Sequence, residues 1–224
     1  MEYVNRAHFR SHTLNIFIRN TEVLLAALHE LRDPEGHVRS LAQEDNGKQT
    51  LRDMTCLIHN FLAGAMTVVD HTRVFVDDYY IGTEVNKFFR EAIKTTFTEN
   101  QLTRFIQDLR NYMIHRGPVP VIRKFSLEPS DGGKPGQFTA STGFYLTKQD
   151  LLKWSGWKSD SRKYLVSAKA EIDVLVLVES YKEIIYDFHE KFDQAILGYH
   201  KDDLVALEKM KAAFNQDGDD PSKP

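Results

Sequence analysis

Three long stretches of this chain place apolar side chains at the three- and four-residue intervals of an α-helix, and this pattern constrains the fold most. They cover residues of about 4–31, 48–80 and 161–196. Residues 172–178 alone would fit a strand, but flanks rich in Glu, Lys and Ala favour a helix. Shorter helices are predicted at about 84–97, 101–115 and 202–214. Because such helices bury their apolar faces against one another, we expect a mainly all-α bundle.

One segment departs from the helical pattern. Residues 119–127 and 137–146 are rich in β-branched and aromatic side chains, and a Gly- and Pro-rich stretch at 130–136 separates them. This composition predicts a β-hairpin insertion at about 119–146, whose removal should leave the helical bundle folded. The Gly-Gly-Lys at 132–134 lacks the spacing and the Ser or Thr of a phosphate-binding loop, so we interpret it as a flexible turn.

Length and composition limit the domain organisation and the class of function. The 224 residues, 42% of them apolar, suffice for one domain, predicted at 1–215 with a disordered polar tail at 216–224. A net charge of −3 argues against a general polyanion-binding protein but leaves room for a local basic cleft. Cys56 is the single cysteine, and we expect it to be buried rather than a nucleophile. The absence of a possible intrachain disulfide, of a signal peptide and of a long apolar run predicts a cytoplasmic protein without membrane contact.

The helix that ends near residue 115 carries the side chains with the clearest chemistry. Residues 110–115 read Arg-Asn-Tyr-Met-Ile-His, and Arg-Gly-Pro follows at once. An arginine can hold a phosphate bidentately and a histidine can transfer protons near neutral pH, as RNA phosphodiester cleavage requires. A second Arg-x4-His at residues 32–37 contains a Pro and a Gly that exclude a helix, so spacing alone does not identify a site.

Helical geometry gives this helix two faces. The apolar stripe consists of Leu102, Phe105, Ile106, Leu109 and Met113, and the nearly opposite face carries Arg104, Asp108, Asn111 and His115. Arg110 lies between the faces, separated from His115 by about 140° of rotation and roughly 7.5 Å of rise. The two side chains of one chain therefore do not converge on one small group. Because a twofold axis could bring them together from two chains, we expect a homodimer in which the two motif helices face each other.

The segment Arg110-Asn111-Tyr112-Met113-Ile114-His115 resembles the hallmark of the HEPN superfamily, in which Arg is followed by a polar residue, three further residues and His. The specific resemblance covers these residues only, while the compatible helical pattern covers most of the chain. It implies an HEPN-like helical bundle, dimeric, with a composite site that cleaves RNA, as in many toxin and defence systems. It also makes an antitoxin or another regulatory protein a candidate partner.

The resemblance further implies a role for each motif residue. His115 would be the general base or acid, Arg110 would stabilise charge on the phosphorane oxygens, and Asn111 would orient phosphate or imidazole. The ribose 2′-hydroxyl would be the nucleophile, so no metal and no cofactor are expected. HEPN toxins controlled by a nucleotidyltransferase antitoxin often carry Tyr two residues after the His. That position is Gly117 here, which argues against that particular regulation.

Other polar residues are candidates for ancillary or RNA-binding roles: Asp70, Arg73, Arg104, Asp108 and Arg116. Asp70 has apolar neighbours in the second long helix, so we expect it to be buried and paired with Arg73. Arg116 is followed by Arg123 and Lys124 in the first hairpin strand, and these could extend a phosphate path or simply be solvated.

Two other functions fit the same residues. The chain could be a non-catalytic HEPN-like interaction or nucleotide-binding module, or a structural bundle whose hairpin mediates assembly. Trp154, Trp157 and Phe144 could stack on bases, but packing within the connector is favoured. His71, Asp77 and Asp78 lack metal-ligand spacing, so no metal site is expected.

Overall fold

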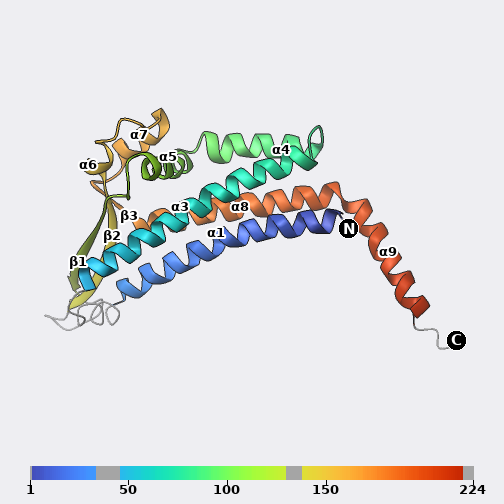
Figure 1. Ribbon diagram of the computed structural model, residues 1–224, viewed down its shortest axis with the longest axis horizontal. Helices are drawn as coiled ribbons and strands as arrows, with labels where there is room; N and C mark the ends of the chain where they lie inside the picture. Colours follow the sequence, from blue (N-terminus) through green and yellow to red (C-terminus); the bar gives the residue numbers. More distant parts are fainter. Residues whose placement is uncertain (1, 34–45, 130–137, 219–224) are drawn as a thin grey trace.

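The computed structural model describes residues 2–33, 46–129 and 138–218. The elements follow in the order α1 (Glu2–Arg32), α3 (Asn46–Tyr79), α4 (Glu84–Ile93), the π-helix η1 (Lys94–Thr98), α5 (Gln101–His115), β1 (Val121–Pro129), β2 (Phe138–Thr147), α6 (Lys148–Leu151), α7 (Ser159–Ser167), β3 (Glu171–Asp173), α8 (Val174–Tyr199) and α9 (Lys201–Gly218). The helices α1, α3 and α8 run alongside one another, α4 and α5 flank α3 on the side away from α1, and the sheet lies at one end (Figure 1). The predicted mainly α-helical fold with a β-hairpin is confirmed.

The apolar faces of the three long helices build the main core. Phe17 of α1, Phe61 of α3 and Tyr181 of α8 are almost fully buried where these helices meet. Their ring centroids lie 5.9 to 6.0 Å apart, and the rings of Phe17 and Phe61 both meet Tyr181 edge to face. Such aromatic pairs contribute about 0.5–1.5 kcal/mol beyond the burial of their area. This contact fixes how the three helices pack.

The helix predicted over residues 161–196 is mostly helical but not continuous, because it is interrupted at residues 168–173. The chain forms α7, then the short strand β3, and only then α8. The helical conformation ends at Ala168, which is extended with φ −65° and ψ 157°. Asp173 then caps α8, because its Oδ1 accepts hydrogen bonds from the backbone N of Leu175 and of Val176 at 2.9 and 3.5 Å. An Asp directly before an apolar run is a helix-start signal, and here it outweighs the continuous periodicity.

The path into α5 and out of it is set by local residues. Asn100 is the N-cap, and its Oδ1 accepts from the backbone N of Leu102 and of Thr103 at 2.9 and 3.3 Å. Asn is among the residues preferred at this position, because its side-chain oxygen satisfies backbone N–H groups of the first turn. After His115 the chain turns at Gly117, whose φ of +130° disfavours any residue with a Cβ. The helix therefore ends where the sequence predicts.

The sheet is more integrated than an inserted hairpin. β1 and β2 pair antiparallel from Val121↔Leu146 to Pro129↔Phe138, and β2 also pairs with β3 through Leu146↔Ile172. Four sheet side chains belong to the main core: Val121, Phe144, Leu146 and Ile172. Removing residues 119–146 would therefore open the core, contrary to the expectation that the bundle would survive. The predicted turn at 130–136 lies outside the described residues.

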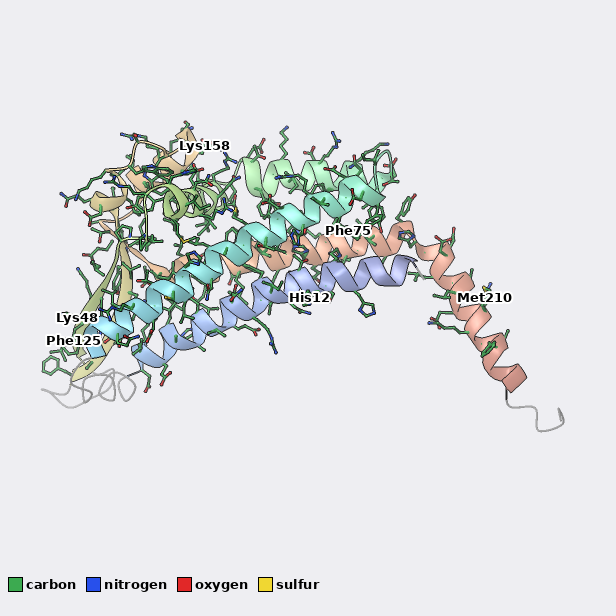
Figure 2. All side chains as sticks on the ribbon, in the orientation of Figure 1. His12, Lys48, Phe75, Phe125, Lys158 and Met210 are labelled. Carbon is green, nitrogen blue, oxygen red and sulfur yellow. The ribbon has the colours of Figure 1, made fainter. Side chains whose placement is uncertain are left out.

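The opposite end of the molecule has a smaller core and a projecting helix. This core contains Phe75, Val76 and Tyr80 of α3, Val85 and Phe89 of α4, and Phe188, Phe192 and Ile196 of α8. α9 contributes to neither core and extends away from the body, as Met210 in Figure 2 shows. Residues 216–218, expected in the tail, belong to α9, and 219–224 lie outside the described residues. Across the described ranges, none of the helices combines the length and apolar character needed to cross a membrane.

Candidate functional site

A buried carboxylate fastens the middle of α5 to α7. Asp108 is 1% exposed, and its Oδ2 accepts from Ser161 Oγ at 2.7 Å and from the backbone N of Lys158 at 3.1 Å. Lys158 is the N-cap residue of α7, and its own side chain makes no capping hydrogen bond. Asp108 therefore caps α7 from a neighbouring helix. This gives Asp108 a structural role in place of the ancillary RNA-binding role expected from sequence.

The neighbouring polar side chains of α5 are also engaged. Asn111 is half-buried, and its Nδ2 donates to Asp108 Oδ1 at 3.4 Å. Arg104 Nη1 donates to Gln107 Oε1 at 2.7 Å. Because α7 packs over Asp108, the polar face expected to meet a second chain is covered in its middle. Such a contact would therefore have to involve the part of α5 that follows Asp108.

Arg110 and His115 differ from these neighbours. Arg110 is half-buried at the flank of α5, and His115 is exposed in its last turn. In the described ranges, neither side chain makes a hydrogen bond or an ion pair. Arg116 is exposed directly after them, and the exposed Lys158 side chain starts from the same α5–α7 contact, at the upper edge of Figure 2. The end of α5 thus exposes the imidazole of His115 and the guanidinium of Arg116 to solvent.

Aromatic rings lock the opposite side of the motif into the fold. Tyr112 stacks on Trp157 with ring centroids 5.8 Å apart, and Trp157 in turn stacks on Phe105 at 5.6 Å. Trp157 is 6% exposed and its Nε1 donates to the carbonyl of Leu151 at 2.7 Å. Trp154 meets both Tyr112 and Trp157 edge to face. Phe144 is 1% exposed in the main core. The prediction that Trp154, Trp157 and Phe144 pack inside the protein is confirmed.

Two predictions about α3 are wrong. Asp70 and Arg73 do pair, at 3.4 Å, but their side chains are 63% and 52% exposed, so this is a surface ion pair of small energetic weight. Their position also lies apart from the motif, since Asp70 is about 16 Å along α3 from His59, which lies beside the end of α5. Cys56 is exposed, not buried, because it faces away from the apolar stripe of its helix.

The remaining basic candidates are held elsewhere. Lys124 pairs with Glu171 of β3 at 2.5 Å, and Arg123 also has an interaction within the protein. Arg32, from the second Arg-x4-His, pairs with Asp173, the cap of α8. Of the candidates named from sequence, Arg110, Asn111, His115 and Arg116 lie in or directly after the C-terminal half of α5, but within the described residues no hydrogen bond or ion pair joins any two of them. Lys158 and Ser161 were missed, because nothing local marks residues about 50 positions away as neighbours of Asp108.

Within the described part of the chain, no group of three or more His, Cys, Asp or Glu could hold a metal ion. Burial raises the pKa of the Tyr164 phenol, whose ring stacks on Phe105. No family model, curated protein or solved structure matches the chain.

Proposed function

We propose that the protein is a metal-independent endoribonuclease whose site is formed by Arg110, Asn111 and His115. The observation that carries the proposal is the contrast along α5. Arg104, Asp108 and Asn111 are used inside the fold, whereas Arg110 and His115 make no hydrogen bond or ion pair within the described residues. A guanidinium and an imidazole left accessible on an otherwise occupied helix are suited to bind and cleave a phosphodiester.

The chemistry follows from these groups. His115 takes the proton of the ribose 2′-hydroxyl as its oxygen attacks phosphorus, and the bond from phosphorus to the 5′-oxygen breaks. The leaving 5′-oxygen receives a proton from a second imidazole or from water. Arg110 stabilises the negative charge that develops on the phosphorane oxygens. The products are a 2′,3′-cyclic phosphate and a 5′-hydroxyl, and because the nucleophile belongs to the RNA itself, the reaction requires no metal.

Asn111 serves this site through its anchored amide. Its Nδ2 donates to Asp108, which fixes the amide plane and leaves Oδ1 to accept a hydrogen bond from an imidazole or a ribose hydroxyl. Asp108 is itself held by Ser161 and by the start of α7. The resulting chain of contacts gives the site a rigid support.

The site is completed by a second copy of the chain. About 140° of rotation separates Arg110 from His115 on one helix, so Arg of one protomer would act with His of its partner. Since α7 covers Asp108, the contact would involve the part of α5 from Arg110 to His115 in each chain. The cellular setting consistent with such an enzyme is a toxin, defence or stress-response system with RNA as target and a regulatory protein as inhibitor.

The test is RNA cleavage in EDTA by wild type, Arg110→Ala and His115→Ala. Loss of a preorganised charge donor costs about a hundredfold to a thousandfold in rate, and loss of the proton-transfer group about a hundredfold to ten-thousandfold. Arg19→Ala and His12→Ala are matched controls, because both residues are exposed on α1. Both should cleave as wild type does, with cyclic phosphate ends. Unchanged cleavage by His115→Ala would refute the assignment.

A mixing experiment tests the composite site. Arg110→Ala and His115→Ala proteins are combined after separate purification and allowed to exchange subunits. If Arg and His act across the dimer, mixed dimers contain one intact site, and the rate should recover to about a quarter of wild type. If each chain carries a complete site, the mixture stays inactive.

The alternative is a non-catalytic interaction or nucleotide-binding module. It is favoured by the packing of α7 on α5, which restricts the face available to a second chain. RNA binding that depends on Arg110, with no cleavage of several RNAs by wild type, would select this alternative.

A further inference from the structure

A pocket of about 440 Å³ opens beside the end of α5. α3 supplies one wall, and the opposite wall is Met113 together with the segment that leaves α5. The lining includes Cys56, His59, Asn60, Met113, Pro118 and Val119. Most of the lining surface is apolar, and Val119, at 4% exposure, joins the pocket floor to the main core.

Polar groups meet at the α3 wall of this pocket. His59 and Asn60 follow Cys56 by three and four positions, so the three side chains share one face of α3. All three are exposed. Within the described residues His59 and Asn60 make no hydrogen bond or ion pair. The imidazole of His59 and the amide of Asn60, which can both donate and accept hydrogen bonds, therefore border an apolar cavity and make no hydrogen bond within the described residues.

Cations lie close to the same opening. Arg110 precedes Met113 by three positions, which places the two about 60° apart on the same side of α5. Arg116 directly precedes Gly117 of the pocket wall, and its side chain is exposed. A ligand with a flat apolar body in the pocket and an attached anion outside it would satisfy both environments. A nucleotide has this division between base and phosphate.

We propose that this pocket binds one nucleobase of single-stranded RNA, next to the phosphate held by Arg110. His59 stacks on the base, as aromatic side chains do with unstacked RNA bases. Asn60 forms hydrogen bonds with the edge of the base, and Met113 with Pro118 contacts its other face. The choice of RNA rests on the function proposed above, and the pocket adds a subsite that selects the nucleotide beside the cleaved bond.

Cys56 provides a direct measurement of occupancy, because it lines the pocket, is exposed and is the single cysteine of the chain. The rate of its reaction with a chromogenic disulfide reagent is followed in the full-length protein. The probe is a short single-stranded oligoribonucleotide with 2′-O-methyl riboses, which lacks the nucleophile and cannot be cleaved. Four homopolymeric versions, one for each base, compare the bases.

We expect saturating oligonucleotide to slow the labelling of Cys56 by about tenfold or more, with one base more effective than the others. His59→Ala should weaken binding by about fivefold to a hundredfold, from the stacking contribution of one base. Asn60→Ala should reduce the difference between bases. His12→Ala, on α1, should change neither quantity. Far-ultraviolet circular dichroism and the melting temperature establish that each variant is folded.

The outcomes separate this subsite from the ribonuclease activity. Protection of Cys56 that depends on His59, without cleavage of unmodified RNA, would support the subsite while refuting the enzyme. Cleavage that depends on Arg110 and His115, with labelling of Cys56 unaffected by the oligonucleotide, would refute the subsite alone. Protection that survives both His59→Ala and Asn60→Ala would also refute it, because the base would then lie elsewhere.

Discussion

Replacing Asp108 tests the contact that holds α7 on α5. In Asp108→Ala the hydroxyl of Ser161 and the backbone N–H of Lys158 lose their buried acceptor. Hydrogen bonds to a charged group contribute about 1.5–3 kcal/mol each, so the loss of two gives roughly 3–6 kcal/mol before relaxation. Water can reach the exposed start of α7 and partly replace them. We expect a decrease in the free energy of unfolding of about 3 kcal/mol.

Urea denaturation followed by tryptophan fluorescence measures this change, because Trp157 lies one residue from the α7 cap. A loss of about 3 kcal/mol corresponds to a lower melting temperature by roughly 6–12 °C for a chain of this size. Ser161→Ala removes one partner only and should cost about 1–2 kcal/mol. The double variant Asp108→Ala/Ser161→Ala should lose less stability than the sum of the two single losses, since the two side chains share one hydrogen bond.

Asp160→Ala is the matched control. Asp160 lies in the same first turn of α7, but it is partly exposed and pairs with Lys163 at 3.0 Å on the surface. Its loss should cost less than about 1 kcal/mol. If Asp108→Ala unfolds at the same urea concentration as wild type while RNA binding falls, the carboxylate serves RNA and the structural assignment fails.

Three further predictions concern other parts of the fold. Burial, and to a lesser extent the charge of Arg10, lower the pKa of His189 from 6.5 to about 3. As the pH falls, His189 is therefore protonated in the unfolded state before it is protonated in the folded state. The contribution of His189 to the free energy of unfolding should be fully present above pH 6.5 and fall by up to about 1.4 kcal/mol per pH unit below it. In His189→Gln the urea midpoint should depend less on pH between pH 4.5 and 7. Deletion of residues 119–146 should abolish cooperative melting, because it removes core side chains, whereas a Gly/Ser linker replacing 127–140 should leave it intact. Truncation after His200 should change the melting temperature by less than a few degrees, because α9 adds nothing to either core; a large change in calorimetry would contradict this.

The helices could be predicted where local signals agree with periodicity. The bounds predicted for α1 and α3 lie within two residues of those observed, and Asn100 and Gly117 mark the two ends of α5. The signals conflict over residues 161–196. There the apolar spacing continues across the end of α7, the strand β3 and the start of α8. Asp173 caps α8, and Ile172 of β3 pairs with Leu146 of β2. Periodicity reports which side chains are buried, but a short buried strand between two helices gives the same pattern.

Burial of individual polar residues could not be predicted, because it depends on contacts distant in sequence. Asp70, with apolar neighbours along its helix, faces solvent, and Asp108, on the polar face of α5, is buried. A helical wheel gives the direction of each side chain but not the element that covers it. The partners of Asp108 at Lys158 and Ser161 come from α7, about 50 residues further along the chain.

The motif itself shows how packing and chemistry divide one short segment. Tyr112 stacks on Trp157 in the core, Met113 lines the pocket, and the amide of Asn111 is tied to Asp108. These residues are explained by the fold and its cavity, so their identities alone would not indicate an enzyme. Arg110 and His115 have no such explanation, because neither side chain makes a hydrogen bond or an ion pair within the described residues. The functional assignment depends on these two positions, and the mixing experiment is the measurement that isolates them.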